Sequence, residues 1–281
     1  TLSRSSAASD VYKRQDDAKL VYIIGTEVPI PGGAQEEEEN VIPTSQNDAE
    51  ETISVTKAAF ESVGLHDAWE RVYGLVVQPG VEFGDDQVFH YQRSAAESLS
   101  REIIKYERLV YEAHSTDYQS ETGLTQLVED HYCILKVGPW LTFGYREALF
   151  ALSMIEEELL SSKSMKTSKL RDVIEEVMME DPKYWKKYYP GDKSEQYFKR
   201  KYSFSDRSRY YWPNEKIRNA VDLLISNLKQ YTISLSLLSQ YLPNQYTAVN
   251  EGVINNDVED IILHRTQEVI GIYARACKMA K

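Results

Sequence analysis

One short stretch of the sequence holds many side chains that can bind a metal or move a proton. Leu109–Tyr111 is apolar and predicts a buried strand, and the positions after it are mostly polar. The candidate groups are Glu112, His114, Ser115, Thr116, Asp117, Tyr118 and Gln119. This run is too polar for a core and too dense for an ordinary turn. Parallel β/α folds place their sites at the carboxyl ends of strands, so the pattern predicts a site here.

Glu27 and His114 are the residues that we expect to bind a divalent metal. Each follows a predicted strand, and a carboxylate with an imidazole suits Zn²⁺ or Mn²⁺. Structural hydrogen bonds at the strand ends are the alternative for both. Glu112 lies on the same strand face as His114, because side chains repeat every second residue. It is a candidate catalytic base or ligand, and pairing with a lysine is its alternative.

Further polar residues at strand ends are candidates for contact with a substrate. Asp117 is a candidate catalytic group, and it could order a sugar hydroxyl together with Gln119 and Gln78. Hydrogen bonding within the loops is the alternative for all three. Gly138 ends the last predicted strand, at a place where (β/α)8 barrels often bind phosphate. We therefore expect any phosphate group of the substrate near Gly138.

Two arginines in the C-terminal part could also bind phosphate. Arg207 and Arg209 could each donate paired hydrogen bonds to it. Alternatively they stack on Tyr210 or Trp212 and hold this region to the rest of the molecule. A nearby aromatic group predicts a packing or subunit-contact patch, since aromatic side chains dominate interface energetics. Its members are Tyr184, Trp185, Tyr188 and Tyr189.

The composition excludes several classes of partner. The 281 residues include 44 acidic and 32 basic side chains, for a net charge of −12, which argues against a nucleic-acid or anionic-membrane surface. No apolar run approaches the ~20 residues that span a bilayer. The two cysteines, Cys133 and Cys277, form no CxxC pair, and we expect two buried, reduced thiols and a cytoplasmic protein. Residues 1–15 have no apolar segment typical of a signal peptide and predict a disordered or foreign leader.

From residue 19 onward, strands and helices alternate. Apolar runs predict strands at 20–24, 72–77, 109–113 and 132–137, and amphipathic patterns predict helices at 49–63, 94–105, 124–131 and 142–160. Ser94 and Glu97 predict a capping box for the second of these helices. Four βα units indicate an α/β fold with a parallel sheet, either doubly wound or a (β/α)8 barrel. No GxGxxG follows the first strand, and the chain has no GxxxxGK[ST] motif.

The four units occupy residues 16–160, which is half of a barrel. Residues 161–281 predict a helical extension that contains an aromatic and basic loop. Seven sequence segments between residue 19 and the C-terminus together resemble a known protein family. They are Tyr22–Pro29, Val77–Phe83, Val110–Gln119, Ile134–Pro139, Tyr184–Tyr189, Asp206–Pro213 and Ser239–Pro243. Together they resemble the non-catalytic subunit of class II D-tagatose-1,6-bisphosphate aldolase.

The resemblance implies a TIM-type barrel of which only the C-terminal four βα units are present, followed by the helical extension. It implies an accessory subunit that stabilises and activates a separate catalytic aldolase in galactitol, galactosamine or tagatose breakdown. A class II relationship also implies metal chemistry, which disfavours an imine at Lys136. The alternative is a sugar-phosphate aldolase or C4-epimerase in its own right, with a divalent metal on Glu27 and His114. The polar cluster at 112–119 keeps that alternative open.

Overall fold

The computed structural model describes residues 20–25, 41–163 and 165–280. The predicted metal ligand Glu27 and the predicted leader at 1–15 lie outside these residues. Among the described helices, none is long and apolar enough to cross a membrane.

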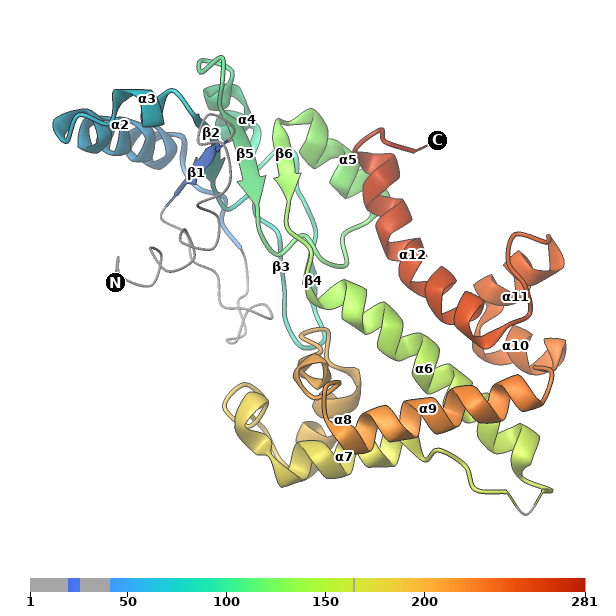
Figure 1. Cartoon of the computed structure of the whole chain (residues 1–281). Helices are drawn as coiled ribbons and strands as arrows, with labels where there is room; N and C mark the ends of the chain where they lie inside the picture. Colours follow the sequence, from blue (N-terminus) through green and yellow to red (C-terminus); the bar gives the residue numbers. More distant parts are fainter. Residues whose placement is uncertain (1–19, 26–40, 164, 281) are drawn as a thin grey trace.

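A four-stranded parallel sheet forms the first part of the molecule. Its strands are β1 (Tyr22–Ile24), β2 (Val72–Val76), β5 (Val110–Ala113) and β6 (Tyr132–Leu135), and they lie side by side in chain order. All three pairings are parallel, which confirms the four predicted strands and the α/β class. The arrowheads of β5 and β6 point toward the helical part of the chain (Figure 1).

Four helices accompany the sheet strands. They are α2 (Gln46–Ser62), α3 (His66–Trp69), α4 (Glu97–Ile103) and α5 (Glu121–Glu129). Ser45 and Ser120 cap α2 and α5, because each side-chain oxygen accepts a hydrogen bond from a backbone N–H in the first turn. Gly64, just after α2, has φ +75°, a conformation that glycine adopts readily at a helix C-terminus. The core beneath includes Ile53, Leu75, Leu99, Tyr111, Leu124 and Tyr132.

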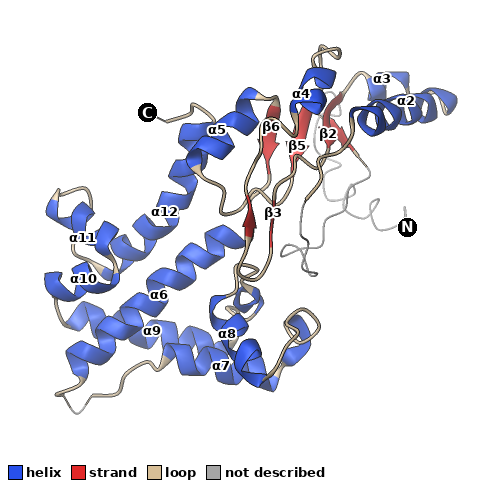
Figure 2. Cartoon of the chain, turned by 180° about the vertical axis from the view of Figure 1, so that it is seen from behind, coloured by secondary structure: helices blue, strands red, loops and turns tan. Residues whose placement is uncertain are grey.

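The remaining helices form a second group beyond the carboxyl ends of the strands (Figures 1 and 2). They are α6 (Pro139–Leu160), α7 (Leu170–Glu180), α8 (Lys193–Tyr202), α9 (Glu215–Gln230), α10 (Leu235–Tyr241), α11 (Pro243–Asn250) and α12 (Val258–Ala276), with short 3₁₀ turns η2 (Pro182–Tyr184) and η3 (Arg207–Tyr210). The core of this group includes Leu149, Leu152 and Ile155 of α6. The helix α6 therefore contributes to the packing of the extension, and the end of α12 returns to the sheet core through Ala276.

Local predictions at the starts of helices were partly wrong. The capping box of Ser94 and Glu97 does not form: α4 begins at Glu97 after Ala96, because a turn with a hydrogen bond from Ala95 N to Gln92 O occupies the preceding residues. The helix expected from residue 142 begins at Pro139, since proline fits the first position of a helix.

Three other features differ from expectation. An antiparallel hairpin, β3 (Glu82–Phe83) with β4 (Val88–Phe89), follows β2 and was not predicted. Part of the aromatic and basic region is the regular helix α8, which Asp192 and Glu195 begin with a reciprocal capping box. The expectation of two buried thiols was wrong, because Cys133 is exposed and Cys277 is half-buried. Cys133 alternates away from the buried Tyr132 along β6.

Candidate functional site

The candidate site is built on the carboxyl ends of β5 and β6. Tyr111 and Ala113 face the helix-covered core, so Glu112 projects to the opposite side of the sheet. His114 follows on the same side, and its Nε2 lies 2.8 Å from Glu112 Oε1. Alternation along the strand thus brings together the imidazole and the carboxylate that the sequence singled out.

The neighbouring strand adds a third group to this pair. Glu112 is in register with Ile134, and Lys136 follows two residues later, just beyond the end of β6. The Lys136 ammonium lies 3.4 Å from the same Oε1 of Glu112 that His114 contacts. Glu112 therefore has the lysine partner that the sequence offered as its structural alternative. It contacts the candidate ligand His114 as well.

One oxygen of this carboxylate has no hydrogen-bond partner among the residues that the structure describes. Glu112 is only 3% exposed, and its Oε2 is buried without a donor. Burying a carboxylate oxygen without a partner costs free energy, so such atoms commonly mark a functional demand or an absent ligand. Among the described residues, this buried and unpartnered Oε2 is the strongest indication that the Glu112–His114 pair binds a further group.

The Asp117 side chain caps the N-terminus of α6. Its Oδ1 accepts hydrogen bonds from the backbone N–H groups of Gly138 and Trp140, both at 2.9 Å. Burial raises the pKa of this carboxyl, and the two backbone donors partly offset that rise. The backbone N–H of Gly138, which could have donated a hydrogen bond to a phosphate, thus already donates to Asp117. The catalytic role of Asp117 and the phosphate role of Gly138 stay predictions.

The two predicted glutamines also bond to backbone within loops. Gln119 accepts from Tyr91 N at 3.0 Å and donates to Phe89 O at 2.8 Å, which fixes the segment after β4. Gln78 Oε1 accepts from the N–H groups of Gly80 and Val81 and so closes the turn after β2. Their substrate contacts stay predictions, and the observed bonds match the structural alternative.

Arg207 and Arg209 lie in the extension and contact aromatic rings. The guanidinium of Arg207 stacks 3.2 Å from the ring centroid of Tyr188 and donates to Tyr184 O. That of Arg209 lies 4.7 Å from the ring of Tyr210. Desolvation by burial lowers the pKa of Arg207. These contacts match the stacking alternative, and phosphate binding by either arginine stays a prediction.

Sequence reasoning missed a buried arginine that joins α6 to the extension. Arg146 is 2% exposed, and its Nε donates to Asp206 Oδ1 at 2.9 Å. Its guanidinium also lies over the rings of Phe143 and Phe150, at 4.2 and 5.3 Å from their centroids. The signal was a basic residue in a predicted helix with Phe143 three positions before it and Phe150 four positions after it, which places it on an apolar helix face.

The ring of Tyr118 connects the candidate site to the same region. Its backbone has φ +62°, and its hydroxyl donates to Phe204 O at 2.6 Å. The ring packs against Phe204, with centroids 4.4 Å apart, and against Trp140 and Phe143. A left-handed conformation is costly for a non-glycine residue, so these contacts must stabilise the loop that follows β5.

The described residues supply part of a metal site. Glu112 and His114 offer the oxygen and nitrogen donors that Zn²⁺ or Mn²⁺ accepts, and Oε2 of Glu112 has no hydrogen-bond partner within the described part of the chain. Within the residues that the structure describes, no group of three or more His, Cys, Asp or Glu side chains is arranged around a common point. Glu27, the other predicted ligand, lies outside those residues, and metal binding by Glu27 and His114 stays a prediction.

Comparison with known proteins identifies the family. The model of the D-tagatose-1,6-bisphosphate aldolase subunit GatZ/KbaZ-like family matches residues 3–278. The chain belongs to this family. The match begins within the segment expected to be a leader.

A solved relative shows the same fold. The crystal structure of a probable tagatose 6 phosphate kinase from Sinorhizobium meliloti 1021 is 43% identical in sequence and superposes with a TM-score of 0.83. The alignment covers 92% of this chain and 62% of that one. The chain therefore spans less than two thirds of the length of this GatZ-family protein.

Proposed function

We propose that this protein is an accessory subunit that stabilises and activates the catalytic subunit of a class II D-tagatose-1,6-bisphosphate aldolase. The observation that carries the proposal is the family match over residues 3–278, whose description is that of an aldolase subunit. The geometry adds support, because Asp117, Gln119 and Gln78 all bond to the protein's own backbone. A cytoplasmic location belongs to the same proposal.

We also propose that the sheet is part of a TIM-type barrel. The order β1-β2-β5-β6 never reverses along the sheet, whereas a doubly wound sheet reverses where its two halves meet. On the side away from the helices, Ile23 is 45% exposed and its side chain lies against Gly74 of β2. An exposed apolar side chain on this side supports the proposal, because in a closed barrel this side faces the interior and further strands next to β1 and β6 would cover it.

The proposed function is tested by mixing this protein with a purified catalytic class II aldolase subunit. We expect higher aldolase activity and a slower loss of that activity on warming, because a bound partner stabilises the folded state by mass action. Cleavage of tagatose-1,6-bisphosphate is followed with and without the chain, and bovine serum albumin at equal concentration is the control. Unchanged activity and unchanged inactivation rate would refute the accessory role.

The unpartnered Oε2 of Glu112 favours a second candidate, a metal-dependent aldolase or C4-epimerase acting on ketose phosphates. In this case the protein alone, supplied with Zn²⁺ or Mn²⁺, turns over such substrates. The His114→Ala variant then loses that turnover by a factor of about 100 or more, because a ligand has been removed. His66→Ala, an exposed histidine at the start of α3, is the matched control. No turnover by the wild-type protein with either metal would exclude this candidate.

A further inference from the structure

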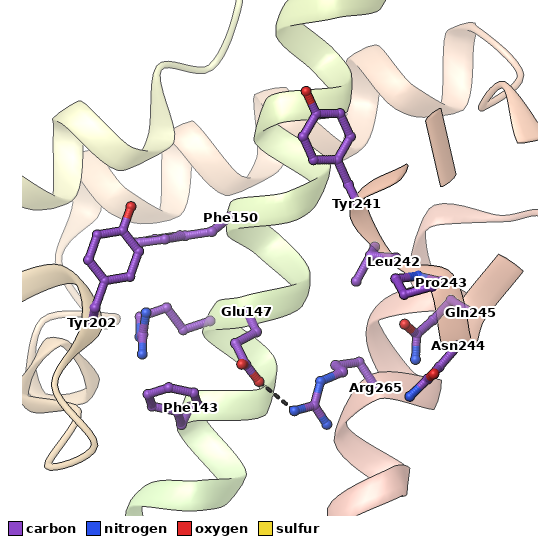
Figure 3. A pocket seen from close by; sticks show the side chains of 11 residues that line it. Phe143, Glu147, Phe150, Tyr202, Tyr241, Leu242, Pro243, Asn244, Gln245 and Arg265 are labelled. Carbon is purple, nitrogen blue, oxygen red and sulfur yellow. Dashed lines mark hydrogen bonds and ion pairs between the residues drawn. The ribbon is translucent and has the colours of Figure 1, made fainter. Parts of the chain in front are cut away.

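A hollow in the helical extension is lined by none of the polar residues that gather at the ends of β5 and β6. Its volume is about 390 Å³, and α6, α12, the end of α8 and the α10–α11 junction line it. Phe143, Phe150 and Tyr202 form an aromatic wall on one side (Figure 3). Asn244 and Arg265 lie on the other side. A concave, largely apolar space with a few polar groups is the usual make-up of a small-molecule site.

The buried guanidinium of Arg146 also lines this hollow and has one nitrogen without a hydrogen-bond partner. Arg146 is 2% exposed, its Nε donates to Asp206 Oδ1 at 2.9 Å, and its Nη1 donates to Lys201 O. Its Nη2 is buried and has no acceptor among the residues that the structure describes. The rings of Phe143 and Phe150 attract the cation but offer no oxygen. A buried donor without an acceptor costs free energy, so Nη2 calls for an oxygen from a ligand.

The charges around the hollow are already balanced, which decides the kind of oxygen. Arg146 is paired with Asp206, whose side chain is fully buried. Arg265 forms an ion pair with Glu147, drawn as the dashed line in Figure 3, and a longer one with Glu268. The two guanidinium groups are thus matched by these three carboxylates, and the carboxylates would repel a phosphate or a further carboxylate. An uncharged oxygen is the acceptor that suits Nη2.

The remaining groups of the hollow favour a ligand with several hydroxyl groups. A hydroxyl both accepts and donates hydrogen bonds, so one can accept from Arg146 while another donates to a carboxylate. The carboxylate of Glu147 lines the hollow and is 39% exposed, so it is open to such a donor. The aromatic wall offers ring faces on which the C–H face of a sugar ring can pack. The volume lies in the range of small-molecule sites.

We propose that the hollow binds an uncharged monosaccharide or a similar polyhydroxyl ring compound. One hydroxyl oxygen of the ligand accepts a hydrogen bond from Arg146 Nη2, and the ring packs on the aromatic wall. Protein atoms cover Nη2, so side chains of the wall shift as the ligand enters, a kind of rotamer change that is common on binding. This binding site goes beyond the proposed accessory function and does not depend on it.

Saturation-transfer NMR on the full chain tests the site with three hexoses. D-glucose, D-galactose and D-mannose are each compared with their uronate and their 6-phosphate. We expect at least one hexose to bind with a dissociation constant of about 1 mM or tighter, and both of its charged forms to bind about tenfold more weakly or worse. No binding by any of the three hexoses at about 10 mM would overturn the proposal, and so would equal or tighter binding of the charged forms.

Two variants show whether the bound hexose lies in the hollow. Asn244→Trp fills the hollow from its exposed edge, and Tyr202→Ala removes part of the aromatic wall; each should weaken binding by about tenfold or more. Asn250→Trp is the matched control, because it makes the same change at an exposed position of the same helix, outside the hollow, and should bind as the wild type does. Thermal melting shows that each variant remains folded. Wild-type binding by both Asn244→Trp and Tyr202→Ala would overturn the site.

The contact with Arg146 is tested by changing the ligand, because replacing this arginine would also break its pair with Asp206. The monodeoxy analogues of the hexose that binds best are titrated in turn. We expect the loss of one particular hydroxyl to weaken binding by about tenfold or more, since Nη2 then keeps no acceptor. Equal binding of all the monodeoxy analogues would contradict the contact and overturn the proposal.

Discussion

At the scale of single residues, the chemistry of this protein depends on which polar groups already bond to the protein. The sequence located the polar cluster after β5, and strand alternation correctly placed Glu112 and His114 together. It could not show that Asp117 and Gln119 bond to backbone groups, because these partners lie 21 to 30 residues away in the chain. Such bonds depend on how the loops fold over the strand ends, which no local pattern encodes.

The cap that Asp117 provides for α6 gives a direct prediction. Asp117→Ala leaves the N–H groups of Gly138 and Trp140 without an acceptor, and we expect it to lower the free energy of unfolding by about 1–3 kcal/mol. Asp117→Asn keeps an acceptor oxygen at the same position and should be much less harmful. Urea denaturation at pH 7 measures both, and equal losses in the two variants would contradict the cap.

The contribution of the Asp117 carboxyl to folding stability depends on pH, and the direction of its pKa shift fixes the sign of that dependence. Burial raises its pKa in the folded protein above 3.8, so the folded state binds this proton more tightly than the unfolded chain does. Its contribution to stability is therefore present in acid and is lost as pH rises through the folded pKa. The stability of Asp117→Asn relative to wild type should rise from pH 3.5 to pH 7. A difference that stays constant or falls would contradict this assignment.

At the scale of elements, the repeat of strand and helix was predictable and its connections were not. Apolar runs gave all four sheet strands, because a strand buried on both faces has a distinctive composition. The hairpin β3–β4 was missed because each of its strands has only two residues, too few to show a period. The helix α8 was obscured by its charged and aromatic composition, although its capping box at Asp192 was a readable signal.

The connection between α6 and η3 depends on the buried pair of Arg146 and Asp206. Asp206 also accepts hydrogen bonds from Thr142 and Ser208, so it holds three partners in one place. Arg146→Met would leave a buried carboxylate without its cation, and we expect a loss of about 3–5 kcal/mol in the free energy of unfolding. Chemical denaturation measures it. A loss below about 1 kcal/mol would show that the pair does not hold these elements together.

At the scale of the whole molecule, the chain combines a parallel sheet with a helical extension that lies beyond its strand ends. The alternation of strands and helices stops after β6 and α6, and the domain boundary that the sequence suggests at residue 160 stays a prediction. The sequence did not predict that α6 packs in the core of the extension, since an amphipathic pattern does not say which partner its apolar face meets. The extension also carries three exposed aromatic side chains on α8, namely Tyr197, Phe198 and Tyr202.

The most direct test of the account measures whether this protein changes a catalytic partner. The purified catalytic class II aldolase subunit is assayed for cleavage of tagatose-1,6-bisphosphate over a range of concentrations of this protein. The account predicts that activity rises and saturates, and that the half-life of activity on warming lengthens at the same concentrations. Activity and half-life that stay flat over the whole range would contradict it.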